Sequence, residues 1–246
     1  RQLAPLGADL LLFARNGKKL EEARAAVRGS GGTGKVEIMP LDVSDDAMVK
    51  KVIDRAVRDF GAPDIIINSA GIGSAHYFES ISYDEFDRVM KINLYGTRNV
   101  IAAALPSMKK RGSGVIVNIS SMAGFMSIFG YSSYATSKFA LVGFSEAIRS
   151  ELVRFGIKVL LACPPETDTP FLLEEGKTIP PECRAMKDLM GTLGTDYVAR
   201  FIIRGIARGK YLIMPGYLSR FLYNVQRFSP GWVARGLADI TVARAA

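Results

Sequence analysis

The sequence predicts an α/β domain with a doubly wound parallel sheet. Short apolar runs alternate with longer amphipathic stretches along most of the 246 residues. Apolar runs of about four to eight residues are typical of strands buried on both faces, and amphipathic stretches are typical of the helices that cover such a sheet. Because no repeat or linker interrupts the alternation, we expect one domain over residues 1–246, with residues 211–246 as an apolar, amphipathic tail.

Composition narrows the class of protein further. Apolar residues make up 48% of the chain, which predicts a packed globular domain. Cys163 and Cys183 form no Cys-x-x-Cys pair and His76 is the single histidine, so we expect neither a disulfide framework nor a metal site. The net charge of +8 suits a nucleotide phosphate or a lipid surface. With no recognisable nucleic-acid-binding motif, we expect no nucleic-acid partner.

The first part of the chain follows the alternation closely. Apolar runs predict strands, and amphipathic runs predict helices. We expect, in order, the end of a helix at 2–7, a strand at 8–14, a helix at 18–27, a glycine-rich loop at 28–34, a strand at 36–41, a helix at 45–60 capped by Ser44, and a strand at 63–68.

The remainder continues in the same way. A segment with two prolines, 171–183, is expected to form a mobile lid. We expect a long helix at 83–111, a strand at 115–119, a helix from 131 to about 155, a strand at 157–163, a helix at 195–208 and a final strand at 211–214.

The beginning of the chain departs from the usual dinucleotide-binding (Rossmann-type) pattern. Such folds start with a strand, a glycine-rich turn and a helix whose N-terminus holds the pyrophosphate. This sequence opens with the pattern of that first helix, and its glycine-rich run at 28–34 follows a helix rather than a strand. We therefore expect the first strand and the glycine loop to precede Arg1, and their absence to leave a gap between the strands at 8–14 and 63–68.

A tyrosine and a lysine four residues apart form the main candidate catalytic pair. Tyr134 and Lys138 share one face of the helix predicted from residue 131. An ammonium beside a phenol favours the phenolate, which makes the phenol a usable general acid or base near neutral pH. Taken alone the pattern is weak, because an ordinary amphipathic helix can carry both residues.

Residues upstream of this pair make the pattern specific. A predicted buried strand ends in two serines, and Ser121 lies thirteen residues before Tyr134. Asn68-Ser-Ala-Gly71 and Lys91-Ile-Asn93 precede it in the chain. In order and spacing, these elements resemble the short-chain dehydrogenase/reductase family, whose active site is a strand-end serine followed by Tyr-x-x-x-Lys.

The resemblance implies hydride transfer at a nicotinamide, with one role for each catalytic residue. Ser121 would hydrogen-bond the substrate oxygen, and Tyr134 would protonate it during reduction. Lys138 would lower the pKa of Tyr134 and hold the nicotinamide ribose. Asn93 would link the proton relay to water, and an asparagine inside a helix is otherwise slightly unfavourable.

The resemblance also implies a cofactor site, and its basic residues indicate NADPH. Arg15 ends the first strand beside the expected adenosine ribose, where a basic residue suits the 2′-phosphate of NADP and an acidic one suits NAD. Asp42 has helix capping as an alternative role. The expected cofactor contacts are Arg15, Lys19, Asp42, Val43, Asn68, Ala70, Gly71, Tyr134, Lys138, Pro164, Thr167 and Thr169.

The run Pro164-Pro-Glu-Thr-Asp-Thr-Pro170 bears on the substrate. It resembles the corresponding run of the 3-ketodihydrosphingosine reductases within that family, which implies reduction of a long-chain keto-lipid in sphingolipid synthesis. A rigid turn after a strand is the structural alternative. A steroid, retinol or fatty-aldehyde dehydrogenase and a non-catalytic nucleotide-binding scaffold are the other functional hypotheses.

The tail has the composition of a segment that contacts a membrane surface. Leu218, Phe221, Leu222 and Val225 follow helical spacing, with arginines among them. Closure of the substrate pocket or a subunit contact explains the same pattern. No run of 18 apolar residues is present, so we expect at most peripheral contact, in the cytoplasm or on the cytoplasmic face of a membrane (the endoplasmic reticulum in a eukaryote). By analogy with the family, a homo-oligomer is also expected.

Overall fold

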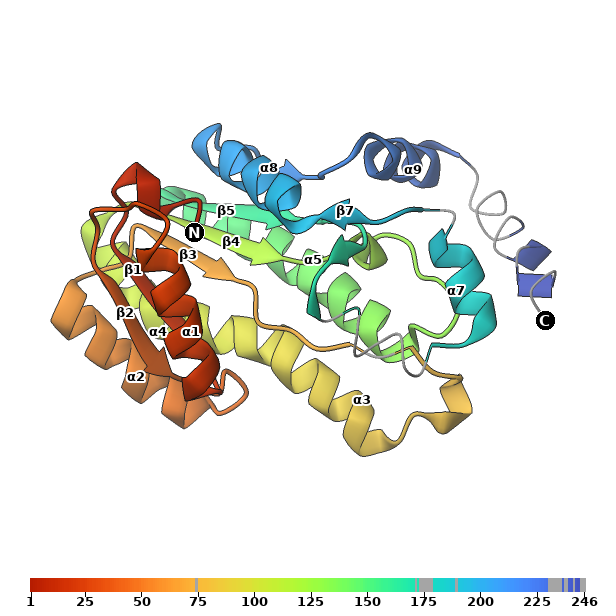
Figure 1. The fold of residues 1–246 in the computed structure, drawn as a ribbon, viewed down its shortest axis with the longest axis horizontal. Coiled ribbons are helices and arrows are strands. Elements are labelled where there is room, and N and C mark those ends of the chain that lie inside the picture. The colour runs from red at the N-terminus through yellow and green to blue at the C-terminus, as the bar shows by residue number, and fades with distance from the viewer. Residues whose placement is uncertain are drawn as a thin grey trace.

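The alternation of strands and helices predicted from the sequence is present in the structure. The computed structural model describes residues 1–73, 75–170, 172, 179–188, 190–229, 236, 239–240 and 242–243. All strand pairs in this part of the chain are parallel, and helices cover both sides of the main sheet (Figure 1). The doubly wound α/β class is therefore confirmed.

A four-stranded parallel sheet forms the centre of the domain. Its strands follow the order β3 (Ile65–Asn68), β4 (Gly114–Ile119), β5 (Ile157–Ala162) and β8 (Leu212–Ile213). Every residue of β5 except Lys158 is buried, because helices cover both faces of this strand. Residues from α2 (Asp46–Phe60), α4 (Gly96–Arg111) and α5 (Ser132–Leu152) pack on one face, and residues from α8 (Thr195–Ala207) pack on the other.

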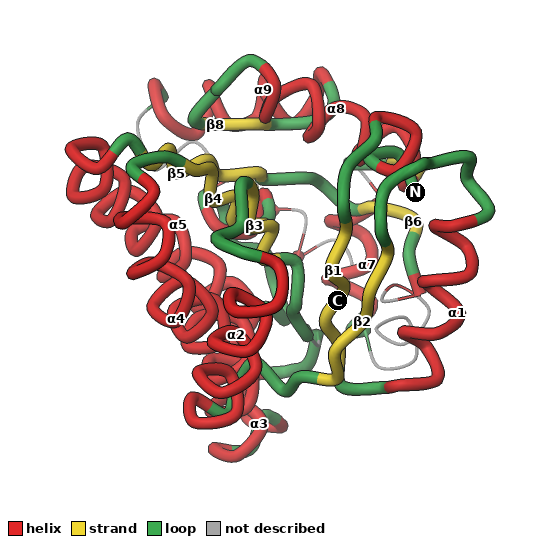
Figure 2. Tube along the Cα trace, turned by 90° about the vertical axis from the view of Figure 1, so that its left-hand side faces the viewer, coloured by secondary structure: helices red, strands yellow, loops and turns green. Residues whose placement is uncertain are grey.

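The first two strands form a separate pair. β1 (Leu10–Ala14) pairs with β2 (Val36–Pro40), and α1 (Gly17–Arg28) packs against both strands. In the described part of the chain β1 shares no ladder with β3, and the two stand apart in Figure 2. Ile65 and Ile67 of β3 are 43% and 40% exposed, although central strands normally bury such residues. The gap predicted between these strands is present.

The long helix predicted at 83–111 has a π-helical segment in its interior. α3 (Tyr83–Met90) continues through Lys91–Tyr95, which has π geometry, into α4. Short π segments within α-helices occur frequently at functional sites. Here the segment contains Asn93, whose side chain is fully buried.

The cap predicted for the second helix is wrong by one residue. Asp45 is the N-cap of α2, and its carboxylate accepts the Met48 N–H at 2.9 Å. Ser44 instead donates its hydroxyl to Asp42 at 2.6 Å. Serine and aspartate are both good caps, so composition alone does not separate two adjacent candidates.

The C-terminal part contains elements that the sequence pattern did not predict. β6 (Thr167–Asp168) pairs with β7 (Leu193–Gly194), and α7 (Pro181–Asp188) lies between them in the chain. Most of the expected lid at 171–183 lies outside the described residues, and so does most of the tail beyond Ser229. α9 (Tyr217–Phe228) is described, and no described helix combines the length and apolar character needed to cross a bilayer. Short 3₁₀ turns occur at Ala4–Leu6, Phe78–Ser80, Met122–Gly124 and Val153–Phe155.

Candidate active site

Three loops meet at one edge of the main sheet. Asn68 ends β3, Ile119 ends β4 and Ala162 ends β5, so the residues that follow each strand lie at the same edge. In open α/β sheets, ligands bind beyond the carboxyl ends of the strands. This edge carries the serines after β4 and the proline pair after β5.

A cavity of about 420 Å³ opens beside these loops, which is a typical volume for a small-molecule site. Ser121, Tyr134 and Lys138 all line it, so the structure brings three of the four predicted catalytic residues to one cavity. Pro164, Thr167 and Thr169, predicted to contact the cofactor, line it as well. Much of the wall is apolar, from Met122, Ala123, Met126, Ile128, Pro165, Leu172 and Met190.

Lys138 is the most deeply buried charged residue of this site, with 5% of its surface exposed. Its Nζ donates to the main-chain oxygen of Ile119 at 3.0 Å and lies 5.6 Å from the centre of the Tyr134 ring. Burial lowers the pKa of Lys138 to about 8, because removal from water disfavours the ammonium form. At pH 7 the side chain is still mostly charged, so a cation lies beside the Tyr134 phenol.

Ser121 is held at the end of β4 by a local hydrogen bond. Its hydroxyl oxygen accepts the Ala123 N–H at 3.1 Å, which fixes the side chain and leaves the hydroxyl hydrogen as a donor. The adjacent Ser120 donates to the main-chain oxygen of Lys138 at 3.1 Å. This contact joins the end of β4 to the middle of α5.

Asn93 does not line the cavity but supports its wall. Its Oδ1 accepts the Ile72 N–H at 2.8 Å, and its Nδ2 donates to the Ile72 carbonyl at 2.8 Å and to Ser137 Oγ at 2.9 Å. The amide therefore fixes the loop after β3 to α5. Asn93 is a positioning residue in this geometry, and its expected contact with water stays a prediction.

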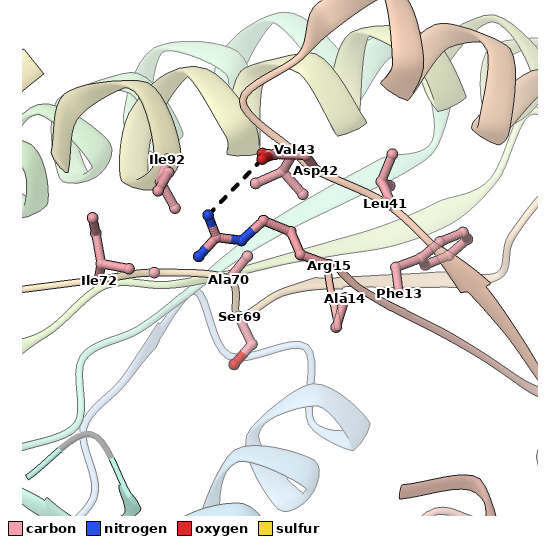
Figure 3. Close-up of a pocket in the computed structure, with 11 residues that line it drawn as sticks. Phe13, Ala14, Arg15, Leu41, Asp42, Val43, Ser69, Ala70, Ile72 and Ile92 are labelled. Carbon is pink, nitrogen blue, oxygen red and sulfur yellow. Dashed lines mark ion pairs between the residues drawn. The ribbon is translucent and has the colours of Figure 1, made fainter. Parts of the chain in front are cut away.

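A second pocket, of about 340 Å³, is lined mainly by the end of β1 and by residues that follow β1, β2 and β3 (Figure 3). Arg15, Asp42, Val43, Ala70 and Gly71, all predicted to contact the cofactor, line this pocket. Arg15 forms an exposed ion pair with Asp42 at 3.9 Å. Hydrogen bonds from Ser44 and, to a smaller extent, the charge of Arg15 lower the pKa of Asp42.

The two pockets share Ser69 and Gly71, so they form neighbouring parts of one site. A Cβ built on Gly71 would stand 3.3 Å from Asn93 Oδ1 and 3.7 Å from Lys138 Nζ. Glycine therefore lets the loop after β3 lie close to Asn93 and Lys138 at the junction of the pockets. The residues present fit an extended dinucleotide, with a basic group at one end and the Ser-Tyr-Lys set at the other.

Two residues predicted to contact the cofactor lie outside both linings. Asn68 donates to Asn118 at 2.9 Å, and Asn118 donates to Ser145 at 2.8 Å, which makes a buried network across β3, β4 and α5. Lys19 lies in the first turn of α1. Its backbone N–H donates to the side chain of the N-cap residue Asn16, and its own side chain is exposed. Cofactor contacts by these two residues stay predictions.

Sequence reasoning missed the polar residues on the far side of the main cavity. Tyr131, Glu166 and Lys187 line it. Glu166 was noticed only as part of the proline-rich run, and Lys187 falls in a helix that was not predicted. A charged residue between prolines that follow a buried strand was the one available signal.

The fold and the arrangement of the two pockets define an α/β domain of the dinucleotide-binding type. A family model described as short chain dehydrogenase matches residues 1–179. The chain belongs to the short-chain dehydrogenase family.

Similar solved structures agree with the fold. The crystal structure of levodione reductase superposes with a TM-score of 0.81 at 28% identity, covering 89% of this chain and 91% of that one. A short-chain dehydrogenase from Sphingobium yanoikuyae in complex with NADPH gives a TM-score of 0.77 at 25% identity, covering 96% of this chain and 87% of that one.

Among curated relatives, the chain is similar to sphingolipid reductases. It is 34% identical over 208 residues to the 3-dehydrosphinganine reductase of Danio rerio, which covers 83% of this chain and 63% of the relative. It is 36% identical over 222 residues to a 3-dehydrosphinganine reductase of Arabidopsis thaliana, which covers 89% of this chain and 65% of the relative. The chain thus spans less than two thirds of these relatives.

The buried ammonium of Lys138 makes a prediction about stability and pH. Its pKa is about 8 in the folded protein and 10.5 in the unfolded chain, so the unfolded chain binds more protons between these values. The penalty for burying the charge is fully present below pH 8 and is relieved as the pH rises toward 10.5. Relative to Lys138→Met, the parent should gain up to about 3 kcal/mol of unfolding free energy over this window.

Urea denaturation of the parent and of Lys138→Met between pH 7 and pH 10 measures this difference. Lys50→Met, which replaces an exposed lysine on α2, serves as the control. A difference between the parent and Lys138→Met that stays constant with pH would contradict the assigned burial cost.

Proposed function

We propose that the protein uses NADPH to reduce a long-chain keto-lipid, and that this lipid is 3-ketodihydrosphingosine, reduced to dihydrosphingosine. The observation that carries the proposal is the convergence of Ser121, Tyr134 and Lys138 on one cavity with a largely apolar wall. An apolar wall suits an alkyl chain, and the polar set suits a carbonyl at its end. The names of the curated relatives support this choice of substrate.

Different residues carry out different parts of the proposed carbonyl reduction. NADPH would supply the hydride when bound. Ser121 donates its hydroxyl hydrogen to the carbonyl oxygen, which positions the carbonyl and polarises it. Tyr134 delivers the proton to the same oxygen, and the adjacent Lys138 ammonium stabilises the phenolate that is left.

NADPH is favoured over NADH by the charge of the smaller pocket. Arg15 is the basic residue at the end of β1, and its guanidinium points into this pocket (Figure 3). Its pair with Asp42 is exposed and long, so the guanidinium is available to a 2′-phosphate at little cost. The structure from Sphingobium yanoikuyae in complex with NADPH, a member of the same fold, supports this cofactor.

Two other functional classes are alternative hypotheses for the same site. A steroid, retinol or fatty-aldehyde dehydrogenase would use the same catalytic residues, and substrate comparison separates it from the proposed reductase. A non-catalytic scaffold does not explain why a buried lysine is held beside a tyrosine and a serine at a cavity. Oligomerisation through the long helices, expected from the resemblance, stays a prediction.

Removal of the Tyr134 hydroxyl tests the catalytic assignment. Tyr134→Phe keeps the ring but removes the proton donor, so turnover of 3-ketodihydrosphingosine should fall at least about 100-fold while NADPH binding persists. NADPH oxidation with this ketone in detergent, beside a steroid ketone and a fatty aldehyde, measures the effect. Tyr83→Phe, on the exposed side of α3, is the matched control. Turnover of Tyr134→Phe close to that of the parent would remove the assignment.

Reversal of charge at Arg15 tests the cofactor assignment. Arg15→Asp should reduce the preference for NADPH over NADH by at least about tenfold, because a carboxylate repels the 2′-phosphate. The ratio of kcat/KM for the two cofactors is the quantity to compare. Arg208→Asp, an exposed arginine outside both pockets, controls for net charge. Equal use of both cofactors by the parent would refute the role of Arg15.

We also propose that α9 contacts the cytoplasmic face of a membrane, from which a lipid ketone would be drawn. Leu222 and Tyr223 pack against the core. Tyr217, Phe221 and Phe228 follow a helical spacing on another side of α9 and are 85%, 58% and 80% exposed. Aromatic residues next to arginines, here Arg220 and Arg227, favour the interface between lipid and water.

Binding to vesicles tests the role of α9. Replacement of Tyr217, Phe221 and Phe228 by serine should reduce cosedimentation with anionic phospholipid vesicles at least about tenfold, since the buried aromatic area is lost. Tyr83→Ser removes an aromatic residue that is 83% exposed on α3 and should leave binding unchanged. Equal cosedimentation of the triple variant and the parent would exclude α9 as the contact.

A further inference from the structure

The main cavity contains a second charged pair, apart from the catalytic residues. Among the described residues that line it, Lys138, Glu166 and Lys187 are the charged ones. Lys138 belongs to the catalytic set. Glu166 and Lys187 have no role in the mechanism, yet they face the same cavity as Ser121 and Tyr134.

Several contacts hold the Glu166–Lys187 pair in place. Lys187 Nζ lies 2.5 Å from Glu166 Oε2, and the two side chains are only 11% and 18% exposed. Glu166 Oε1 accepts the Thr192 hydroxyl at 2.6 Å, and the Glu166 carbonyl accepts the Leu193 N–H at 2.9 Å. A lysine on α7 and a threonine next to β7 therefore hold the carboxylate of Glu166 in place, and its main chain is held by Leu193 of β7.

The pair is also connected to the catalytic tyrosine. Lys187 donates to the Tyr131 hydroxyl at 3.1 Å. The rings of Tyr131 and Tyr134 lie with their centres 5.3 Å apart. The charged pair is thus one aromatic ring away from the candidate catalytic phenol and lines the same cavity.

A purely structural role does not account for this placement. A buried ion pair contributes little net stability, because the loss of hydration offsets the attraction. An ion pair that only joined α7 to the loop after β5 would not need to face the cavity, where a ligand can compete for its carboxylate and ammonium groups.

The carboxylate has capacity for a ligand. A carboxylate offers about four acceptor positions. Oε2 of Glu166 is enclosed and paired with Lys187, so the positions open to a ligand lie on Oε1, which accepts one hydrogen bond from Thr192. An otherwise apolar cavity with an acceptor of this kind fits a molecule with an alkyl chain and a cationic, hydrogen-bonding head.

We propose that Glu166 is the specificity-determining residue for the polar head of the substrate, and that its carboxylate binds an ammonium on the carbon next to the carbonyl. Lys187 and Thr192 are positioning residues that hold the carboxylate. The ligand class is a long-chain 2-amino ketone and the matching 2-amino alcohol. This inference rests on the proposed function, and it names which feature of a lipid ketone the site distinguishes.

Equilibrium binding to the full-length protein tests the subsite without turnover. The ligands are a twelve-carbon 2-amino-1,3-diol, its N-acetyl derivative and the chain-matched 1,3-diol without nitrogen. Calorimetry should show that the parent binds the amine at least about tenfold more tightly than either other ligand, because only the amine is charged. Equal affinity of the parent for the three ligands would overturn the subsite.

Substitution of Glu166 then assigns the effect to one residue. Glu166→Gln should bind the three ligands within about threefold of one another, and Glu166→Asp, which keeps the charge, should restore the preference for the amine. Glu182→Gln changes a half-buried carboxylate on α7 that accepts a hydrogen bond from Tyr77 outside the cavity lining, and it should behave as the parent. Preference for the amine retained by Glu166→Gln would overturn the proposal.

Turnover separates this inference from the proposed function. If the protein reduces 3-ketodihydrosphingosine but shows no preference for an amine, the proposed reductase function is supported and the proposed subsite is refuted. A preference for the amine that depends on Glu166, without reduction of any ketone, would support the subsite and refute the reductase.

Discussion

The burial of the Lys138 ammonium is the constraint on which the rest of the site depends. A cation with 5% exposure keeps its charge at pH 7 only with acceptors at fixed positions, and the carbonyl of Ile119 at the end of β4 is one of them. Ser120 in turn holds the main chain of Lys138. The end of β4 and the middle of α5 therefore have to stay in register, and the same contacts bring Tyr134 and Ser121 to one cavity.

The π-helical segment supplies the third side of this arrangement. An extra residue in a helical turn changes which side chains point inward, and here Asn93 points toward the loop after β3. Its amide nitrogen donates hydrogen bonds to the main-chain oxygen of Ile72 and to the Ser137 hydroxyl on α5. The loop that separates the two pockets is thereby fixed to the helix that carries the catalytic pair, so both pockets keep a constant relation to Lys138.

Local pattern predicted most of the strands and helices and three residues that the structure brings to one cavity, because these depend on periodicity and on short spacings. Contacts between segments far apart in the sequence could not be predicted from local pattern. Asn68 and Asn118 are 50 residues apart and meet because β3 and β4 pair in register, so Asn68 joins a buried network rather than a pocket lining. Glu166 and Lys187 meet because β6 and β7 pair around α7, and two-residue strands leave no periodic signal. The cap at Asp45 was missed because its neighbour Ser44 is equally suited by type.

The two ion pairs of the site differ in how readily a ligand can replace one partner of the pair. Arg15 and Asp42 are 61% and 35% exposed and 3.9 Å apart, so their attraction is worth at most about 1 kcal/mol and a phosphate can take the guanidinium. Glu166 and Lys187 are mostly buried, and separation would leave two charges without compensation in an apolar cavity. A ligand at this second pair must therefore add to it, by using the acceptor positions that remain on the carboxylate. Under the proposed function, the exposed pair exchanges its partner for a cofactor, whereas the buried pair stays intact and selects among substrates.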